Sequence, residues 1–339
     1  MKITQEKYEK AELLINEFPK QLGEGAGLAK DVGKKYHGHK FNRIVIAGMG
    51  GSALPGEILM CVARDINLKL PIIIHRNYNL PYAIQKQDLV VVISYSGNTE
   101  ETLSAYREAK KQKLSLLAIA TGGKLAEWAR RDKTPLVIVP PGVPPRMALG
   151  YQFAALLGIL YNVGLVKSQE NTLKEAVHQL NPTYLKKEGR KFAKKIGNRT
   201  VLFYASQRYR ALAYILKIQM NENAEIHAFW NVFPELNHNE MVGYSRSANY
   251  HPARYITFLI KSADDHPRIK KRMEITEKML RQKGYKTDAI LMRGKNPFVK
   301  IFGTILLGDW VGYYHAKARR VDPLSIAIVE EFKKRMTAT

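Results

Sequence analysis

Short apolar runs alternate with amphipathic stretches along most of this 339-residue chain, and this alternation restricts its fold more than any other feature. In the first half, the apolar runs occupy 43–50, 71–75, 88–94, 115–121 and 135–140. Each run has the length of a strand, and the stretches between them have the apolar spacing of helices. Strands that alternate with helices form a parallel sheet covered on both faces, so we expect a doubly wound α/β domain.

The alternation returns in the second half, with apolar runs at 199–206, 254–261 and 288–294. Charged sequence with helical spacing fills 168–196, and the segment "LSIAIVEEFKKRM" (324–336) predicts a final helix. A chain of this length holds about two domains. We therefore expect two doubly wound parallel-sheet domains in series and a C-terminal helix, with boundaries at 1–165, 166–322 and 323–339.

A group of hydroxyl side chains follows the third apolar run, in the segment "SYSGNT" (94–99). Ser94, Ser96 and Thr99 surround Gly97 just where a helix is predicted to begin. The first backbone N–H groups of a helix are unpaired and carry the positive end of its dipole, which favours an anion. One hydroxyl here would be only a helix cap, but three together predict a phosphate-binding loop.

A glycine-rich segment, "GMGGSA" (48–53), follows the first apolar run and matches the G-x-G-x-x-A pattern of dinucleotide-binding proteins. That pattern expects an acidic residue after the second strand, where this chain has His75 and Arg76. An arginine there could accept the extra phosphate of NADP, so an NADP-dependent dehydrogenase is one alternative. A dinucleotide site has no need of the hydroxyl group at 94–99. Both segments follow strands of one parallel sheet, so they could face one ligand.

The chain is strongly basic, with 54 Lys and Arg residues against 30 Asp and Glu and a formal net charge of +24. Such a charge attracts anions of every kind. Basic runs at 186–195, 268–272 and 333–335 lie on segments with helical spacing and no interleaved aromatics, and the chain has no recognisable nucleic-acid-binding module. We interpret these runs as solvated helix faces and expect neither nucleic acid nor membrane as a partner.

Other features of the sequence limit the class of protein to which the chain can belong. No apolar stretch reaches the roughly 18–20 residues of a membrane span, and the first residues are too charged for a signal peptide, so we expect a cytoplasmic protein. The single cysteine, Cys61, excludes an internal disulfide and a multi-thiolate metal site, and its apolar neighbours place it in the core. The nine histidines are scattered, and we expect no metal.

Four segments together resemble the bifunctional phosphoglucose/phosphomannose isomerases, whose two domains are of the sugar isomerase (SIS) type. They are "GMGGSALPGEI" (48–58), "SYSGNTEETL" (94–103), "PPGVPPRMALGY" (140–151) and "MNENAEIHAFWNVFPELNHNEMVGY" (220–244). The likeness covers both halves and, more weakly, the C-terminal helix. It implies two SIS-type domains and an aldose–ketose isomerase that interconverts glucose 6-phosphate, and also mannose 6-phosphate, with fructose 6-phosphate without any cofactor.

The resemblance also implies roles for residues in the first half. The phosphate group of a hexose 6-phosphate would lie on Ser94, Ser96 and Thr99, which agrees with the phosphate-binding loop predicted from the residues themselves. Gly51 and Ser52 would lie against the sugar.

Further roles fall on matched residues near the reacting atoms. Arg146 matches the arginine of the "PPR" segment, Glu222 the catalytic base, and His238 the histidine that assists ring opening. In this family the histidine usually comes from the other subunit, which implies a homodimer. Lys333 matches a lysine near the sugar ring, and Ser325 stands near the family's hydroxyl position, often a threonine, in an inexact register. The resemblance therefore implies activity on glucose 6-phosphate more strongly than on mannose 6-phosphate.

These residue types suit an isomerase on chemical grounds. One carboxylate can move a proton between C2 and C1, a guanidinium can stabilise the enediolate, and a histidine can protonate the ring oxygen. The alternative is a non-catalytic regulator that binds phosphosugars, which would have no use for a base at Glu222. On their own, Glu222 could be a solvated helix end and His238 a loop residue with local hydrogen bonds.

Overall fold

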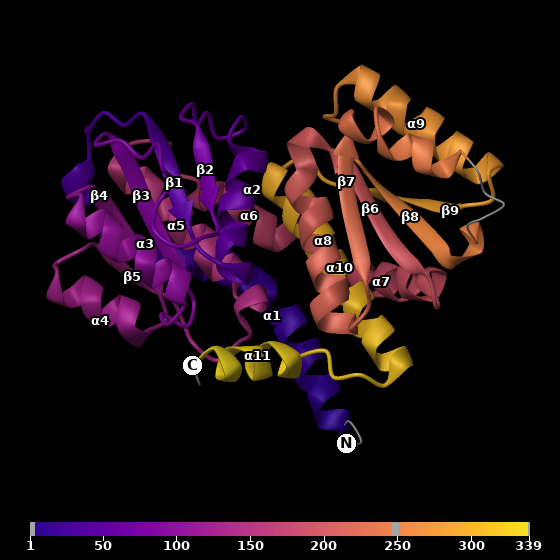
Figure 1. Ribbon diagram of the computed structural model, residues 1–339, viewed down its shortest axis with the longest axis horizontal. Coiled ribbons are helices and arrows are strands. Elements are labelled where there is room, and N and C mark those ends of the chain that lie inside the picture. Colours follow the sequence, from indigo (N-terminus) through magenta and orange to yellow (C-terminus); the bar gives the residue numbers. More distant parts are fainter. Residues whose placement is uncertain (1–3, 246–250, 338–339) are drawn as a thin grey trace. The chain divides into compact units, whose positions relative to one another are not determined.

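The computed structural model describes residues 4–245 and 251–337 and divides into two compact units (Figure 1). The first unit comprises Glu17–Leu180 with Gly294–Val299. The second comprises the residues up to Asn16, Asn181–Arg293 and the residues from Lys300 onward. Each unit holds one parallel sheet, as the alternation of strands and helices predicts.

The sheet of the first unit has the order β2-β1-β3-β4-β5, with every pair parallel. Its strands are β1 (Arg43–Ala47), β2 (Ile72–His75), β3 (Asp88–Ser94), β4 (Ser115–Ala120) and β5 (Leu136–Ile138). All five correspond to predicted apolar runs, which confirms the prediction for this half. The central strand β3 is buried along its whole length, as its nearly uninterrupted apolar sequence requires.

Helices cover both faces of this sheet, so it is doubly wound. They are α1 (Gln5–Leu28), α2 (Leu54–Val62), α3 (Glu100–Lys111), α4 (Gly123–Arg131), α5 (Leu149–Val163) and α6 (Glu170–Gln179). Leu103 of α3 and Leu125 of α4 share one core cluster with Val90 on one face. Gly56 of α2 packs against Ile46 on the other face. Cys61 of α2 is buried, as predicted.

The second unit has a parallel sheet of order β7-β6-β8-β9. Its strands are β6 (Thr200–Ser206), β7 (Ala228–Phe233), β8 (Tyr255–Lys261) and β9 (Lys286–Leu291). Three of these strands correspond to predicted apolar runs, whereas β7 is not predicted from the sequence. This strand lies at the edge of the sheet, exposes Phe229 and Trp230 and carries Asn231 at its middle, so it has no plain apolar run.

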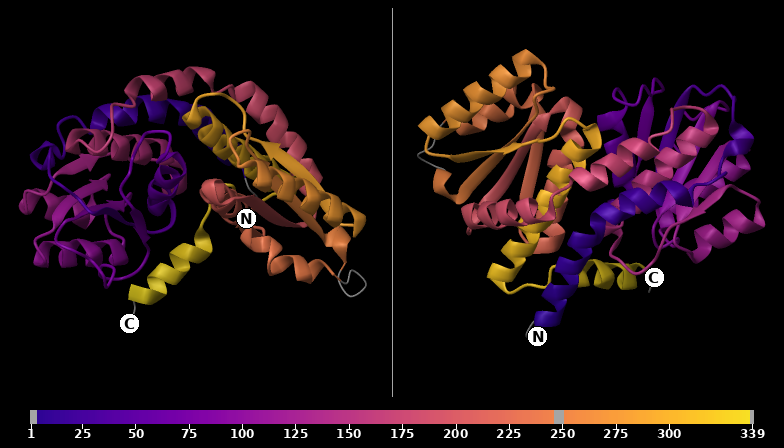
Figure 2. Two further views of the ribbon diagram at one scale, coloured as in Figure 1. Left: turned by 90° about the horizontal axis from the view of Figure 1, so that it is seen from above. Right: turned by 180° about the vertical axis from the view of Figure 1, so that it is seen from behind.

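The helices of the second unit are α7 (Pro182–Ile196), α8 (Arg210–Ala224), α9 (Pro267–Gln282), α10 (Pro297–Arg319) and the C-terminal α11 (Ala327–Thr337). Met273 of α9 shares a core cluster with Tyr204 and Leu259 on one face of the sheet. Figures 1 and 2 show the strands between α9 and the pair α7 and α10. In the described parts of both units, no helix is long and apolar enough to cross a membrane.

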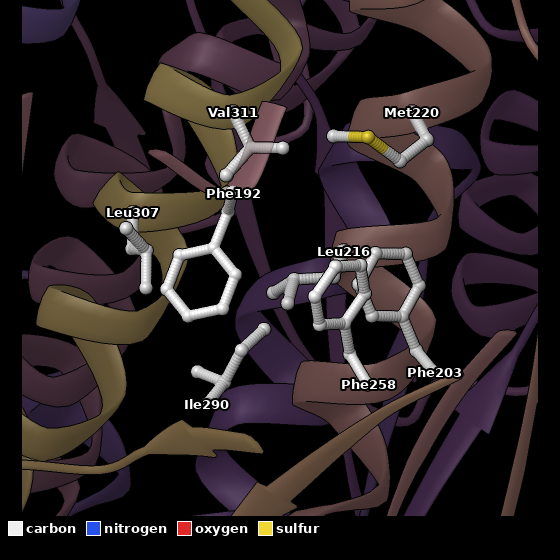
Figure 3. Close-up of a pocket in the computed structure, with 9 residues that line it drawn as sticks. Phe192, Phe203, Leu216, Met220, Phe258, Ile290, Leu307 and Val311 are labelled. Atoms are coloured by element: carbon white, nitrogen blue, oxygen red, sulfur yellow. The ribbon is translucent and has the colours of Figure 1, made fainter. Parts of the chain in front are cut away.

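A cluster of large apolar side chains fills the core between the second sheet and α7, α8 and α10 (Figure 3). The Phe258 ring stacks on Phe203, with centroids 5.8 Å apart, and meets Phe192 edge-on at 5.4 Å. The cavity left among these side chains has a volume of only about 10 Å³, about what one water molecule needs. This face of the sheet is therefore closely packed, and its aromatic rings bury large apolar surfaces there.

We expect Phe258→Ala to lower the free energy of unfolding of the second unit by about 3–5 kcal/mol, because it opens a cavity in a closed core. Phe229→Ala, on the same sheet but 55% exposed, is the control and should cost less than about 1 kcal/mol. Urea titrations followed by fluorescence measure both. Equal losses would mean that the aromatic cluster has no special part in stability.

Candidate active site

The loop of residues 94–99, here called the hydroxyl loop, joins β3 to the start of α3. Ser94 is fully buried, and its Oγ donates to Thr99 Oγ1 at 3.0 Å and accepts the Thr99 N–H at 3.4 Å. Ser96 is exposed, and its Oγ accepts the Asn98 N–H at 3.3 Å. The first N–H groups of α3 have no carbonyl partner within the helix. Ser94 thus closes the loop from inside, while Ser96 lies on its outer side.

A turn after β4 supports the hydroxyl loop. Gly97 has a positive φ of 69°, and a Cβ on this residue would overlap the carbonyl oxygen of Gly122. Asn98 Oδ1 accepts the Lys124 N–H at 3.0 Å. Only glycine fits both the dihedral angle and the approach at position 97. This turn is not among the predicted site elements, although the adjacent glycines Gly122 and Gly123 at the end of a predicted strand are a signal for it.

The glycine loop, residues 48–53, lies beside the hydroxyl loop. Ser52 is buried, and its Oγ accepts the Tyr95 N–H at 2.9 Å. The Gly48 N–H donates to the carbonyl of His75 at 3.1 Å, at the end of β2. A Cβ at Gly48 would lie 2.9 Å from the Ile93 carbonyl oxygen. The structure therefore brings the two loops together at the carboxyl ends of β1 and β3, as expected for one ligand site.

A third segment, the proline loop of residues 140–147, packs against the other two. A Cβ on Gly51 would lie 2.8 Å from the Arg146 backbone nitrogen, so glycine permits this contact. Tyr95 donates its hydroxyl to the Pro140 carbonyl at 2.9 Å and accepts the Val143 N–H at 3.3 Å. Burial raises the pKa of the Tyr95 phenol, which keeps it protonated as a donor. Arg146 itself is buried in this cluster of loops.

Two buried glutamines hold the proline loop from the helices. Gln152 Nε2, in α5, donates to the Pro145 carbonyl at 3.2 Å, and Gln21 Nε2, in α1, donates to the Met147 carbonyl at 2.8 Å. Both side chains are almost fully buried. They position the loop that carries Arg146. Neither glutamine is predicted as a site residue from the sequence, because a glutamine in a helical pattern ordinarily indicates a solvent-facing position.

Arg76, the residue that favoured an NADP site, is held by an ion pair. Its Nη2 donates to Oε1 of Glu57 in α2 at 2.7 Å, and Glu57 is buried. The guanidinium group that would bind the extra phosphate of NADP is therefore already paired with a carboxylate. The geometry therefore disfavours the dehydrogenase alternative.

In the second unit, Glu222 lies half-buried in the last turn of α8. Both of its neighbours are anchored: Asn221 Nδ2 donates to the Ile226 carbonyl at 2.7 Å, and Asn223 Nδ2 donates to Asp309 Oδ1 at 3.3 Å. A carboxylate at the negative end of a helix gains no stabilisation from the dipole. The position of Glu222 is thus well defined by its anchored neighbours. The helix dipole does not stabilise a carboxylate at this end, so it does not explain why an acid stands there.

His238 is exposed and follows the short 3-10 helix η5 (Glu235–Asn237), which comes after β7. The segment is anchored beside it, because Asn237 Nδ2 donates to Thr276 Oγ1 of α9 at 3.0 Å. Glu222 precedes the amino end of β7, whereas His238 follows its carboxyl end. The strand between them, Ala228–Phe233, is itself about 17 Å long at 3.3 Å per residue. One copy of the chain therefore holds Glu222 and His238 at opposite ends of the second sheet.

The remaining predicted residues lie in or near α11. Lys333 is exposed, and its Nζ donates to Glu330 Oε1 one turn earlier at 2.9 Å. Ser325 precedes the helix, and its Oγ accepts the Ala327 N–H at 3.4 Å. Ser325 thus caps the start of the helix that carries Lys333.

Comparison with known proteins agrees with this arrangement. Residues 39–143 match the family model "SIS domain", and 185–336 match "Bacterial phospho-glucose isomerase C-terminal SIS domain". A bifunctional phosphoglucose/phosphomannose isomerase of Caldicellulosiruptor bescii is 32% identical over 95% of this chain and 97% of its own length. A D-glucosamine-6-phosphate 4-epimerase of Sulfolobus acidocaldarius is 34% identical over 60% of this chain and 64% of its own.

Among solved structures, a hypothetical protein of Thermus thermophilus superimposes with a TM-score of 0.72. It is 16% identical, and the match covers 97% of this chain and 91% of that one, so it bears on the fold alone. The matches to two SIS-type models and the nearly full-length relative confirm the resemblance seen in the sequence. The chain therefore belongs to the bifunctional phosphoglucose/phosphomannose isomerase family, and its fold is that of two SIS domains in series.

Proposed function

We propose that this protein is an isomerase that interconverts glucose 6-phosphate and fructose 6-phosphate. The observation that carries this proposal is the cluster of the hydroxyl, glycine and proline loops at one edge of the first sheet. In a member of this family, such a cluster offers one place for a phosphorylated sugar. Gly51 and Ser52 would lie against the sugar, and Arg146 would lie near its reacting carbons.

The phosphate group would bind the outer side of the hydroxyl loop. There the exposed Ser96 stands near the first N–H groups of α3, which favour an anion. Ser94 and Thr99 hold the loop in shape through their mutual hydrogen bonds, and Thr99 stands directly before the helix. Neutral hydroxyl and amide donors bind phosphate reversibly, as a turning-over enzyme requires. The net charge of +24 would further attract the substrate.

Glu222 would act as the base that moves a proton between C2 and C1. The enediolate formed on the way carries negative charge on oxygen, and the Arg146 guanidinium would stabilise it. Because these two side chains supply both the base and the charge stabilisation, the proposed mechanism has no step that requires a metal. Lys333 would add a cation near the sugar ring.

His238 would act in the other subunit of a homodimer. The length of β7 keeps His238 away from Glu222 of its own chain, so ring opening at a site built on Glu222 calls for His238 of the partner subunit. This histidine is exposed on an anchored segment, which leaves its imidazole accessible to a second copy. A protonated imidazole can donate a proton to the ring oxygen, and the neutral form can take a proton back when the ring closes.

A coupled assay of the purified protein tests this function directly. Fructose, glucose, mannose and glucosamine 6-phosphates should be compared, with and without EDTA. We expect turnover between the fructose and glucose forms that survives the chelator. Turnover of none of them would support the regulator alternative, whereas loss of activity with EDTA would contradict the metal-independent mechanism. Activity on mannose 6-phosphate would extend the proposed function to the second substrate named for this family.

We expect Ser96→Ala to raise the Michaelis constant for fructose 6-phosphate by about ten- to a hundredfold with little change in turnover. A hydrogen bond to a charged group is worth roughly 1.5–3 kcal/mol, and the phosphate is held alike in ground and transition states. Ser115→Ala removes a hydroxyl at the opposite, amino end of β4 and serves as the control. Unchanged constants in Ser96→Ala would move the phosphate to another part of the protein.

A further inference from the structure

Helix α7 (Pro182–Ile196) of the second unit presents a basic face that the proposed isomerase does not use. This face and Tyr314 of α10 line an open groove of about 800 Å³. The lining residues are Thr183, Lys186, Lys187, Arg190, Lys191, Lys194, Lys195 and Tyr314. Every charged side chain among them is a cation. The opposite face of α7 is fixed in the core, because Gly189 packs directly on Trp310 of α10.

Carboxylates neutralise the edges of this basic face but not its centre. Lys186 pairs with Glu12, Lys195 with Asp288, and Lys191 with Glu188. The centre is the row formed by Thr183, Lys187, Arg190 and Lys194, whose spacings of four, three and four residues place them on one stripe of the helix. Within the described residues 4–245 and 251–337, no carboxylate pairs with Lys187, Arg190 or Lys194. We call Lys187, Arg190 and Lys194 the central cations.

We propose that the central cations bind the phosphodiester backbone of a nucleic-acid duplex without reading its sequence. The central cations extend about 10 Å along the helix, from Lys187 to Lys194, which is longer than a single phosphate group. A cation that recurs on each turn suits a ligand with regularly repeated negative charges. From the sequence alone, the basic run indicates a solvated helix face. The structure shows that ion pairs neutralise only the edges of the groove, so its centre stays positive and suits a polyanion.

The lining of the groove favours this ligand over other polyanions. The described residues that form it include no aliphatic side chain to insert into a membrane surface and no apolar centre like that of a protein interface. Single strands are usually held by aromatic rings that stack on bases, but the ring of Tyr314 already packs on Trp310, with centroids 6.0 Å apart. These donors can contact the phosphates of a duplex, but they cannot read its base sequence.

Fluorescence anisotropy of the full protein with a labelled duplex of about 20 base pairs tests the proposal at several salt concentrations. The test variant K187A/R190A/K194A is compared with R268A/K271A/K278A, which removes three exposed cations from α9 and so changes the net charge equally. We expect the α7 variant to lower the slope of log K against log salt by about 2.7 and to weaken binding at least tenfold near 0.1 M salt. The α9 variant should keep most of the slope.

A charge-preserving variant, K187R/K194R, should bind like the parent protein, and all variants should keep the parent's melting temperature and isomerase activity. Equal losses in the α7 and α9 variants would assign binding to net charge and overturn the proposal. Unchanged binding of the α7 variant would overturn it as well. Stronger binding of inorganic polyphosphate than of the duplex, at equal phosphate concentration, would show that the duplex is the wrong ligand.

Discussion

Glu222→Gln is expected to lower turnover of fructose 6-phosphate by about 10²- to 10⁴-fold, the range typical of losing a general base. The amide keeps the shape and the hydrogen-bonding capacity of the side chain, so substrate binding should remain nearly intact. Exchange of the C2 hydrogen of glucose 6-phosphate with deuterated water should fall in step with turnover, because both begin with the same proton abstraction. Steady-state kinetics and proton NMR measure the two rates.

Glu225→Gln is the matched control for this variant. It makes the same chemical change next to the same helix end, at the exposed residue that follows α8. We expect near-native turnover from it. If the two variants lost activity equally, the effect would come from the local charge or stability of this helix end. Near-native turnover and exchange in Glu222→Gln would assign the base to another residue.

Mixing two inactive variants should restore activity if His238 acts on the site of the other subunit. His238→Ala and Glu222→Gln should each be nearly inactive as homodimers on the closed-ring sugar. In a heterodimer, one site would combine Glu222 of one chain with His238 of its partner subunit, and both residues there would be intact. Random pairing makes about half of the dimers mixed, each with one good site of two, so about a quarter of native activity should return.

Co-expression with two different affinity tags allows the mixed dimers to be purified and assayed. The control pairs the native chain with a double variant that carries both changes. If the site is shared between subunits, each site of this control lacks one of the two residues, so it should be nearly inactive. Half-native activity in the control, with none in the mixture of single variants, would place His238 and Glu222 of one chain in the same site. Light scattering that found only monomers would contradict the homodimer itself.

Most of the fold could be predicted because buried parallel strands have nearly uninterrupted apolar sequences. All five strands of the first sheet are plain apolar runs in the sequence, and β3, which is buried along its whole length, follows the rule most fully. The edge strand β7 does not, since it has buried Ala228 and Phe233 at its ends and exposed or half-exposed residues between them. Because it contains the polar Asn231 and exposed aromatic residues, its local sequence is not distinguishable from that of a loop.

The residue types of the candidate site could be predicted from the sequence, but the hydrogen bonds between these residues could not. Ser94, Ser96 and Thr99 are equivalent hydroxyls in sequence, but in the structure Ser94 is buried and bonded to Thr99 whereas Ser96 is exposed. Which hydroxyl faces outward depends on the path of the loop, and that path depends on contacts with Gly122, far along the chain. Such long-range contacts leave no periodic signal.

The separation of Glu222 and His238 also required the structure. The two residues are close in sequence, and the missed strand β7 between them carries the chain from one end of the sheet to the other. Once β7 is known, its direction places the two residues at opposite ends of the sheet. The family resemblance implied a shared site between subunits; the strand supplies a physical reason for that proposal.

The measurement that tests the central claim most directly is incubation of the purified protein with fructose 6-phosphate in deuterated water, followed by NMR of the products. A proton shuttle through one carboxylate, whose acquired proton exchanges with solvent while the enediol is bound, predicts glucose 6-phosphate with deuterium at C2. This product should form at an unchanged rate in the presence of EDTA and hardly at all with Glu222→Gln. If no glucose 6-phosphate appeared, or if Glu222→Gln formed it with the same deuterium content at the native rate, the proposed isomerase mechanism would be contradicted.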